Sequence, residues 1–239
     1  MRRYDGRQPE EMRPVTITKD FIKYPEGSVL IECGDTKVIC NATVEEGVPP
    51  FKKGSGSGWV TAEYSMLPRA NRERSRRDID KLKLSGRSAE IQRLIGRSLR
   101  SAVDREALGE RTITVDCDVL QGDGGTRTAS VTGGFVALAL ACRKLLAEGK
   151  VMRDPIIHQV AAVSAGIIDE VPVLDLPYSE DSRAQVDLNC VMNEKGELIE
   201  LQGTGEGRSF TLSEQQELVR LCAKGIRELM EKQREILQR

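Results

Sequence analysis

One stretch near the middle of the chain restricts the possible folds more than any other. In residues 111–120, apolar side chains recur at every second position, which is the pattern of a β-strand with one buried face. The apolar positions are Ile113, Val115, Cys117 and Val119. A glycine-rich turn, 121–128, and then a run of small and apolar residues to about Gly149 predict a following helix. A half-buried strand needs neighbouring strands and a covering layer, so we expect a sheet packed against helices.

Similar patterns on either side extend this picture. Further strands are predicted at 28–33, 37–42, 58–67, 157–168, 171–176, 184–192 and 197–202. Helices are predicted at 88–108, ended by Gly109, and at about 213–238, where Ser213 and Gln216 form a capping-box pattern. Because no linker rich in proline, serine and charge divides the chain, we predict one α+β domain over residues 1–239, with mixed sheets and packed helices.

The distribution of apolar residues and cysteines favours a cytoplasmic protein. The longest uninterrupted apolar run, 135–142, has eight residues, far short of the roughly 20 that span a bilayer. The first residues are polar and lack the apolar core of a secretory signal, so no membrane partner is expected. The six cysteines show no C-x-x-C spacing and mostly fall in apolar runs, which favours buried thiols in a reducing compartment.

Histidine and aromatic residues are scarce in this chain, and their scarcity limits the kinds of catalytic and binding site that it can form. His158 is the single histidine, which argues against a catalytic triad or a histidine-rich zinc site. The nine aromatic residues are too few for the stacking platforms of common RNA-binding sheets. A protein of this composition that handles nucleic acid should do so through charge and backbone contacts.

The charges are unevenly distributed although the net charge is only -1. Residues 69–100 contain nine arginines and two lysines but only four acidic residues, which gives a local net charge of 11 − 4 = +7. The densest part contains Arg69, Arg72, Arg74, Arg76 and Arg77. Guanidinium groups on a loop attract phosphate oxygens of polyanions such as RNA. A solvated loop or a contact with an acidic subunit surface explains the cluster equally well.

Two predicted helix starts carry groups that suit an anion. The turn before the middle helix includes Gly125, Thr126 and Arg127, where backbone N–H groups and the helix dipole favour a phosphate. The turn matches neither a Walker A loop nor G-x-G-x-x-G, and a plain tight turn is the simpler alternative. Arg87 lies at the start of the 88–108 helix, where a cation opposes the dipole unless an anion binds there. A solvent-exposed Arg87 is the corresponding simple explanation.

Asp181 and Asp187 form a third, acidic set six residues apart. Paired carboxylates of this kind hold Mg²⁺ or Mn²⁺ through few direct bonds, with water and substrate phosphates completing the shell. Taken singly, each is more simply a turn residue or part of a solvated strand face. Arginines at helix starts, a glycine-rich turn and two carboxylates together indicate phosphate chemistry. Because free phosphate needs no histidine base, we expect phosphorolysis rather than hydrolysis.

Five motifs, taken together, resemble the bacterial ribonuclease PH family along essentially the whole chain. They are 3–7 (RYDGR), 61–70 (TAEYSMLPRA), 85–97 (with SGR and EIQRLIGR), 123–130 (DGGTRTAS) and 200–206 (ELQGTGE). The resemblance implies a ribonuclease PH-like fold, shared with exosome ring subunits and polynucleotide phosphorylase, and a homo-hexamer built as a trimer of dimers. It implies a phosphate-dependent 3′→5′ exoribonuclease (a tRNA nucleotidyltransferase) that trims tRNA precursors and other RNA ends. The reaction would release nucleoside diphosphates and run backwards when diphosphates are in excess.

The resemblance also implies roles for individual residues. Arg87 and the run Gly125-Thr126-Arg127 would hold inorganic phosphate, the co-substrate. Asp181 and Asp187 would bind the divalent metal, and one of them would protonate the leaving 3′-oxygen. The arginines of 69–77 would guide RNA or support the ring interface. Polynucleotide phosphorylases have a lysine two residues after the second aspartate, whereas this chain has Asn189, to which no role is assigned.

Two alternatives belong to other functional classes. A non-catalytic RNA-binding ring subunit is disfavoured because such a subunit should have lost part of the phosphate or aspartate set, and none is missing. A small-molecule kinase is disfavoured because no nucleotide loop is visible in the sequence. Product analysis with and without ATP would separate a kinase from a phosphorolytic enzyme.

Overall fold

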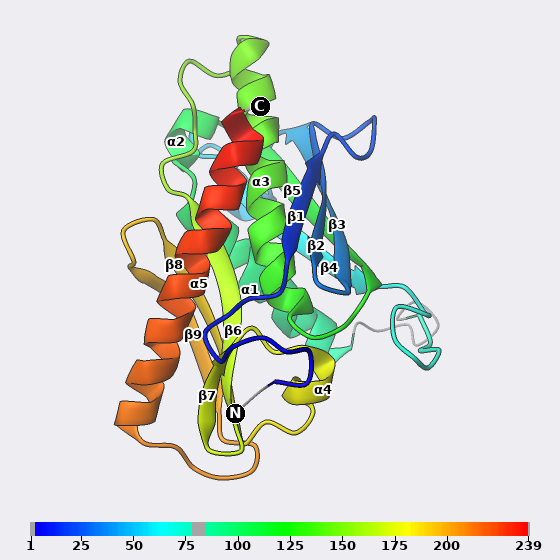
Figure 1. Ribbon diagram of the computed structural model, residues 1–239. Helices are drawn as coiled ribbons and strands as arrows, with labels where there is room; N and C mark the ends of the chain where they lie inside the picture. The colour runs from blue at the N-terminus through cyan, green and yellow to red at the C-terminus, as the bar shows by residue number, and fades with distance from the viewer. Residues whose placement is uncertain (1–2, 78–84, 239) are drawn as a thin grey trace.

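The computed structural model describes residues 3–77 and 85–238, and within these residues the chain forms two sheets (Figure 1). The first sheet has the strand order β1-β2-β3-β5-β4 and the second β7-β6-β8-β9. The first-sheet strands are β1 (Val15–Lys19), β2 (Gly27–Cys33), β3 (Thr36–Glu46), β4 (Trp59–Met66) and β5 (Arg111–Gln121). The second-sheet strands are β6 (Val160–Ile168), β7 (Val171–Leu174), β8 (Val186–Asn193) and β9 (Leu198–Thr204). The predicted α+β class is confirmed.

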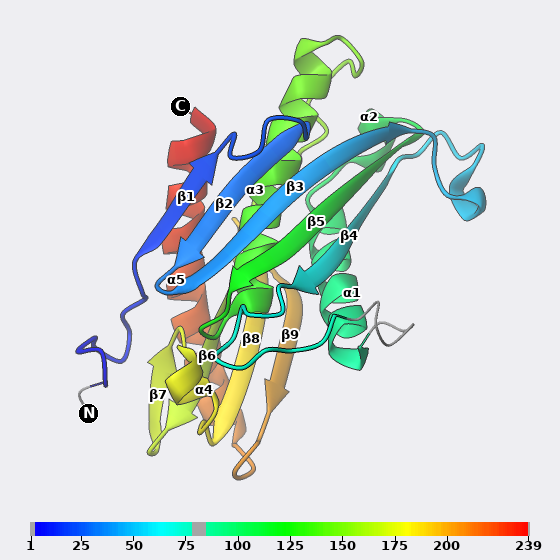
Figure 2. The same cartoon turned by 90° about the vertical axis from the view of Figure 1, so that its right-hand side faces the viewer.

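Helices pack on both sheets. They are α1 (Gly86–Ser101), α2 (Arg105–Leu108), α3 (Thr126–Ala147), α4 (Tyr178–Asp181) and α5 (Leu212–Gln238), with a short 3-10 turn at Pro50–Lys52. Figure 2 shows α1 and α3 behind the first sheet, with their lower ends beside β8 and β9. The arrangement brings the amino ends of two helices to the edge of the second sheet.

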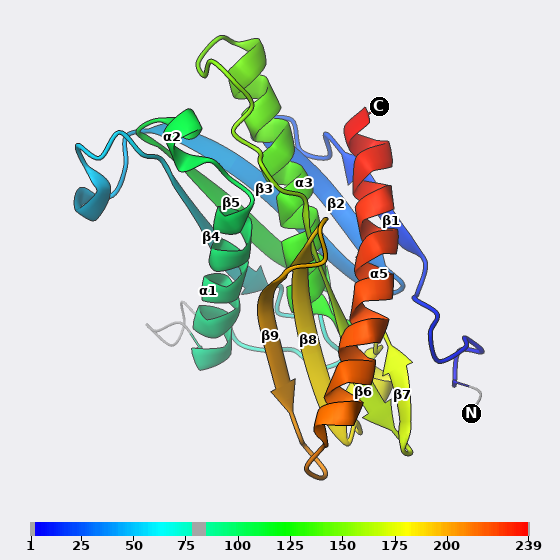
Figure 3. The same ribbon diagram turned by 90° about the vertical axis from the view of Figure 1, so that its left-hand side faces the viewer.

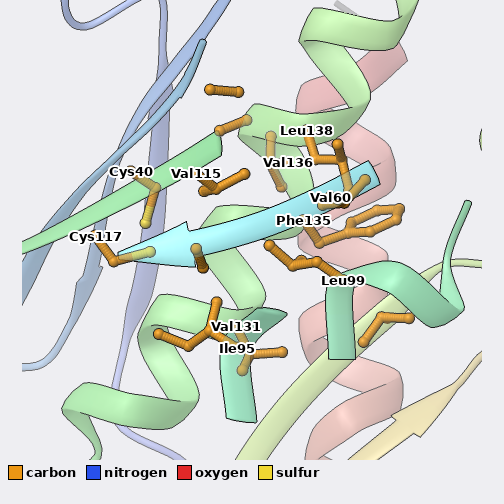
Figure 4. Packing of buried hydrophobic residues seen from close by; sticks show 14 of the residues in the cluster. Cys40, Val60, Ile95, Leu99, Val115, Cys117, Val131, Phe135, Val136 and Leu138 are labelled. Atoms are coloured by element: carbon orange, nitrogen blue, oxygen red, sulfur yellow. The ribbon is translucent and has the colours of Figure 1, made fainter. Parts of the chain in front are cut away.

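The predicted half-buried strand is β5, the centre of the larger core. Its apolar residues face α3, while its polar residues lie on the opposite side of the sheet. In Figure 4, Val115 and Cys117 of β5 lie among side chains from α1 and α3, including Leu99 and Phe135. Gly133 lets α3 approach closely, because an added Cβ would lie 2.7 Å from Cγ2 of Ile31. Small residues in this helix therefore set the distance between helix and sheet.

Strand β6 is buried along its whole length because helices cover both of its faces. Val160 and Ala162 belong to the core around α3, whereas Ala161 and Val163 belong to the core around α5. Figure 3 shows α5 crossing the second sheet from β7 towards β1. Gln233 of α5, fully buried, donates hydrogen bonds of 3.0 Å to the Thr132 carbonyl and 2.9 Å to the Val160 carbonyl. The two cores are thus joined through shared helices.

Helix α3 is long and apolar enough to cross a membrane by length and composition alone. In the fold, however, 78% of its most apolar 18-residue window is buried between the sheets. It therefore has the environment of a core helix. All six cysteines are free thiols, five of them buried and Cys33 partly buried, as the sequence predicted.

Two predictions about helix ends were wrong. The helix predicted at 88–108 ends at Ser101, and α2 begins separately at Arg105. The break arises because Val103 pairs with Ile156 and the Asp104 carboxylate accepts the N–H groups that begin α2. The capping box of α5 lies two residues earlier than predicted. Glu214 N–H donates to Thr211 Oγ1 at 3.2 Å, and Thr211 N–H donates to the Glu214 carboxylate at 2.7 Å.

Candidate active site

The predicted site residues come together where the amino ends of α1 and α3 meet β8 and β9. In the second sheet Asp187 is paired with Thr204, and Asn189 with Gln202. Opposite residues on antiparallel strands point to the same face, so these polar side chains share one surface. That surface looks toward α3, because Asp187 and Asn189 also pair with Gly166 and Ser164, which continue the α3-facing alternation of β6.

The glycine-rich turn begins α3 in the way that the sequence predicted. Gly125 is the N-cap residue with φ +66°, a conformation that favours glycine, so no side chain occupies the helix start. Gly124 has φ +75°, and an added Cβ would lie only 2.4 Å from the Leu176 carbonyl oxygen. The turn therefore packs directly on the segment that leads to Asp181. Thr126 is fixed by Tyr64, whose hydroxyl lies 2.8 Å from Thr126 Oγ1.

Arg127, in the first turn of α3, is held by residues from two other elements. Its Nη1 donates to Oε1 of Glu90 in α1 at 3.0 Å and to Oε1 of Gln202 in β9 at 2.6 Å. The side chain is only 15% exposed. A guanidinium has five N–H donors, so both bonds through one nitrogen leave further donors for an anion.

Arg87 lies in the first turn of α1 and is exposed, and that turn contains no acidic residue. Ser85 caps this helix by accepting the Ser88 N–H at 3.0 Å. Burial raises the pKa of Asp181 above its usual value, while the positive charges of Arg87 and Arg127 act in the opposite direction. Both arginines therefore lie close enough to Asp181 to influence its ionisation.

The environment also shifts the pKa of Asp187. Burial, and secondarily the negative charge of Asp181, raise the pKa of Asp187 to about 6, although Arg127 opposes the shift. A buried carboxyl whose pKa is raised further by a second carboxylate, beside arginines, is typical of sites that handle charged substrates. Asp181 and Asp187, six residues apart in sequence, thus form one electrostatic unit.

One oxygen of Asp187 tests whether a metal ion fits here. Asn189 Nδ2 donates to Asp187 Oδ2 at 3.1 Å, but the buried Oδ1 has no hydrogen-bond partner in the part of the chain that the structure describes. An unpartnered carboxylate oxygen beside a second carboxylate suits a divalent cation. Residues 3–77 and 85–238 contain no group of three or more His, Cys, Asp or Glu that could enclose a metal. The protein would therefore supply few ligands, which suits a cation that also binds substrate phosphate and water.

The arginine cluster borders the glycine-rich turn. All five of its predicted members are exposed. The loop is fixed beside the turn by a hydrogen bond of 2.9 Å from the Gly122 N–H to the Ala70 carbonyl. Residues 78–84, which complete the connection to α1, lie outside the described residues. The cluster is thus placed next to the candidate phosphate site with its guanidinium groups open to solvent.

Sequence reasoning missed four residues that shape the site. They are Tyr64, Glu90, Gln202 and Asn189. The first three lie inside motifs that carry the family resemblance, which was the available signal for them. The contacts of these three span 37 to 112 positions in sequence, so no local spacing could have paired them, whereas Asn189 lies only two residues from Asp187.

The sequence matches two models of one family. The description "3' exoribonuclease family, domain 1" applies to residues 11–144, and "3' exoribonuclease family, domain 2" to residues 158–224. The chain is 57% identical to ribonuclease PH of Bacillus subtilis (strain 168) over 236 residues, which covers 98% of this chain and 96% of the relative. It is 56% identical, with the same coverage, to ribonuclease PH of Bacillus velezensis.

Solved structures show the same fold. The Archaeoglobus fulgidus exosome with RNA bound to the active site contains a chain that matches with a TM-score of 0.83 and 24% identity, covering 96% of this chain and 92% of that one. The rice protein Rrp46 matches with a TM-score of 0.80 and 16% identity, covering 98% and 100%. At these identities the likeness concerns the fold alone, and it confirms the expected ribonuclease PH-like architecture.

Proposed function

The chain belongs to the ribonuclease PH group of the 3′ exoribonuclease family and has its activity, phosphate-dependent 3′→5′ removal of nucleotides in tRNA processing; from this premise we propose which residues carry the reaction out. The observation that carries the assignment is the convergence of Arg127, Asp181 and Asp187 at the amino end of α3. An incoming phosphate and a scissile phosphodiester both need positive charge, and the leaving oxygen needs a proton.

Inorganic phosphate is the nucleophile in this assignment. Arg87, Arg127 and the N–H groups of Gly125 and Thr126 bind and orient it at the start of α3. One of its oxygens attacks the phosphorus of the last nucleotide, in line with the 3′-oxygen of the preceding ribose. The bond to that 3′-oxygen breaks, releasing a nucleoside diphosphate and an RNA one nucleotide shorter. In the reverse direction a diphosphate donates its nucleotide to the RNA end.

The two carboxylates serve the leaving group and the metal. Asp181 and Asp187 would hold Mg²⁺ or Mn²⁺, which when bound neutralises charge on the scissile phosphate. Burial raises the pKa of Asp187 to about 6 and also raises the pKa of Asp181 above its usual value, so either carboxyl is suited to carry the proton for the departing 3′-oxygen. Asn189 keeps one oxygen of Asp187 engaged, so the other is the one available to ligand or proton.

The exposed arginines and the fold suggest how RNA reaches this site. We assign Arg69, Arg72, Arg74, Arg76 and Arg77 to RNA guidance or to a subunit interface, because they lie next to the glycine-rich turn and open to solvent. A homo-hexameric ring of three dimers is the assembly that we propose, supported by the likeness to an exosome chain.

The six free thiols support a reducing compartment, and we propose that the protein is located in the cytoplasm, with no membrane partner.

We further propose that the two family domains act as one unit over residues 1–239. Helix α3 belongs to the first matched segment, yet its Thr132 exchanges hydrogen bonds with the backbone of Ala162 in the second. Arg127 and Gln202 join the same two segments at the site. Neither segment contains all the groups that the reaction needs.

The decisive experiment tests whether the phosphorus of inorganic phosphate is incorporated into the released nucleotide. A tRNA with a short 3′ extension is incubated with the protein, divalent metal and ³²P-labelled orthophosphate, and the released nucleotides are separated. We expect labelled nucleoside diphosphates and no release in phosphate-free buffer. Arg127→Ala should abolish release but bind RNA normally, because the exposed arginines remain. Unlabelled monophosphates released without phosphate would contradict phosphorolysis. RNA binding without release by the intact protein would indicate the non-catalytic alternative.

A further inference from the structure

The segment that precedes β1 contains three arginines that are almost completely buried. Arg3, Arg7 and Arg13 are 2%, 8% and 6% exposed. Arginines are ordinarily solvated, because removing a guanidinium from water is costly unless partners compensate. Arg3 and Arg7 belong to the RYDGR motif, for which the reaction described above has no role. Their burial therefore needs a separate explanation.

Each of the three arginines has a charged partner in one short segment of the second half, which contains Asp175 and Glu180. Arg3 binds the Glu180 carboxylate through Nε, 3.1 Å from Oε1, and through Nη2, 2.5 Å from Oε2. The same guanidinium donates to the Leu174 carbonyl at 2.6 Å and the Asp175 carbonyl at 2.7 Å. Glu180 is 1% exposed. This fork-to-fork pair is thus closed off from solvent, and its carbonyl contacts fix the orientation of the fork.

Asp175 receives the other two arginines. Arg13 binds it through Nε, 2.9 Å from Oδ2, and Nη2, 2.7 Å from Oδ1, and Arg7 Nη1 lies 3.3 Å from Oδ2. Burial opposes ionisation of Asp175, but hydrogen bonds and charge from Arg13, with help from Arg7, hold its pKa below the usual value. Arg13 also donates through Nη1 to the Asp123 carbonyl in the glycine-rich turn. One side chain therefore links the turn to the 174–181 segment.

Leu176 anchors the part of this segment before α4 in a small apolar cluster, and the Asp175 N–H donates to the Ser164 carbonyl at 2.7 Å. Helix α4 is four residues long, too short to be stable by itself, and Glu180 is its one buried residue. Asp181, the next residue, ends the helix and belongs to the candidate active site. The orientation of Asp181 therefore depends on how Glu180 is held, and the buried carboxylate of Glu180 is held by its ion pair with Arg3.

We propose that Arg3 is a positioning residue for the active site: its buried pair with Glu180 fixes α4 and thereby places Asp181, while Arg13 fixes the neighbouring glycine-rich turn. The inference rests on the proposed function of Asp181. A displacement of about 1 Å at a reacting group is enough to reduce turnover strongly. Loss of Arg3 should therefore act on turnover, whereas phosphate binding by Arg87 and Arg127 should persist.

The test compares full-length variants in the phosphate-dependent tRNA assay. Arg3→Met and Glu180→Gln should each lower kcat by about 10- to 100-fold, with KM for phosphate within about threefold of wild type. The double variant should be no slower than the slower single variant, because both changes break the same link. Arg3→Lys, which keeps the charge but loses the fork, should give an intermediate kcat and covers the case in which Arg3→Met does not fold.

A control variant loosens the segment that precedes β1 at a different point. Arg220→Gln removes an exposed contact, 2.7 Å, between Arg220 of α5 and Glu10. It should change kcat less than twofold. Hydrogen exchange supplies a readout independent of activity: the amides of Glu180 and Asp181 should exchange faster in Arg3→Met but not in Arg220→Gln.

Three outcomes would overturn the inference. They are wild-type kcat in Arg3→Met, unchanged exchange in α4, and faster exchange throughout the protein, which would make Arg3 merely structural. Failure of the proposed function is a different result, because it would appear in the wild-type protein as release of nucleotides without phosphate or no release. The exchange comparison would still decide whether Arg3 positions α4.

Discussion

Nη1 of Arg127 lies 2.6 Å from Oε1 of Gln202, so a residue in the first turn of α3 is oriented by a strand of the second sheet. The same nitrogen contacts Glu90 at 3.0 Å, and Gln202 Nε2 lies 3.3 Å from that carboxylate oxygen. The three side chains form a closed set drawn from α3, β9 and α1. The guanidinium that we assign to phosphate is therefore preorganised by neutral and acidic partners together.

This relationship predicts the effect of Gln202→Leu. Removing the amide leaves Arg127 with Glu90 alone, which should pull the guanidinium towards the carboxylate. We expect KM for phosphate to rise by about tenfold, the loss of roughly one charge-assisted hydrogen bond, and kcat to change less. Steady-state kinetics at varied phosphate and saturating RNA measure this split. An equal fall in kcat with unchanged KM would contradict the role given to Gln202.

Asp187→Asn should stabilise the protein while stopping turnover. The folded-state pKa of about 6 lies above the ordinary value of 3.8, so the unfolded protein loses its proton more readily. Ionised Asp187 therefore destabilises the folded state, and this cost appears as the pH rises from about 4 to 6. At pH 8 the variant should gain up to about 3 kcal/mol, or several degrees in Tm.

The pH dependence of that gain is the sharper measurement. Thermal unfolding of both proteins at pH 4 and pH 8, without metal, should show a difference that nearly vanishes at the lower pH. Asp35→Asn, at an exposed position, is the matched control and should shift Tm little at either pH. A destabilised Asp187→Asn at pH 8 would show that the carboxylate is satisfied in the folded protein.

Gly124→Ala tests the contact between the glycine-rich turn and the segment that leads to Asp181. The new methyl would meet the Leu176 carbonyl at 2.4 Å in addition to the strain of φ +75°. Gly149→Ala is an exact control for strain alone, since its φ is +67° and nothing lies within 4 Å. We expect a loss of about 1 kcal/mol for Gly149→Ala with full activity, and a larger loss with reduced kcat for Gly124→Ala. Equal unfolding free energies would refute the close packing.

The exposed arginines should act through the charge of RNA. Replacing Arg72, Arg74 and Arg76 by Gln should weaken RNA binding and reduce the slope of log K against log[salt] by about 2. The triple variant R220Q/R227Q/R234Q, on the exposed side of α5, removes the same charge far from the site and should leave the slope unchanged. Size-exclusion chromatography separates the two roles, because smaller assemblies with an unchanged slope would assign the cluster to subunit contacts.

Local sequence patterns predicted much of the fold because the periodicity of apolar residues within each central element is enough to identify that element. The alternation of β5, the glycine-rich turn and the small-residue helix α3 lie next to one another in sequence, and each has its own periodicity. The helix break at Asp104 was missed because it depends on pairing between Val103 and Ile156, 53 positions away. A helical pattern cannot show that a strand-like contact will interrupt it.

In the candidate site, too, some residues could be predicted from the sequence and others could not. Arg87, Arg127, Asp181 and Asp187 could be selected from sequence because their residue types suit phosphate chemistry, and the structure brings them together. The groups that orient them could not be selected. Glu180 looks like any surface glutamate of an acidic turn, and only the fold shows that Arg3 buries it.

The pairing of Arg3 with Glu180 also fixes the order in which the protein can mature. These residues are separated by 177 positions, so Arg3 has no partner until the segment around Glu180 has been synthesised. Strands β1 to β5 and α3 can assemble earlier, whereas α4 cannot be clamped until then. Asp181 and Asp187 follow Glu180 in the sequence, so a chain that stops short of this point lacks both carboxylates of the candidate site as well as the clamp.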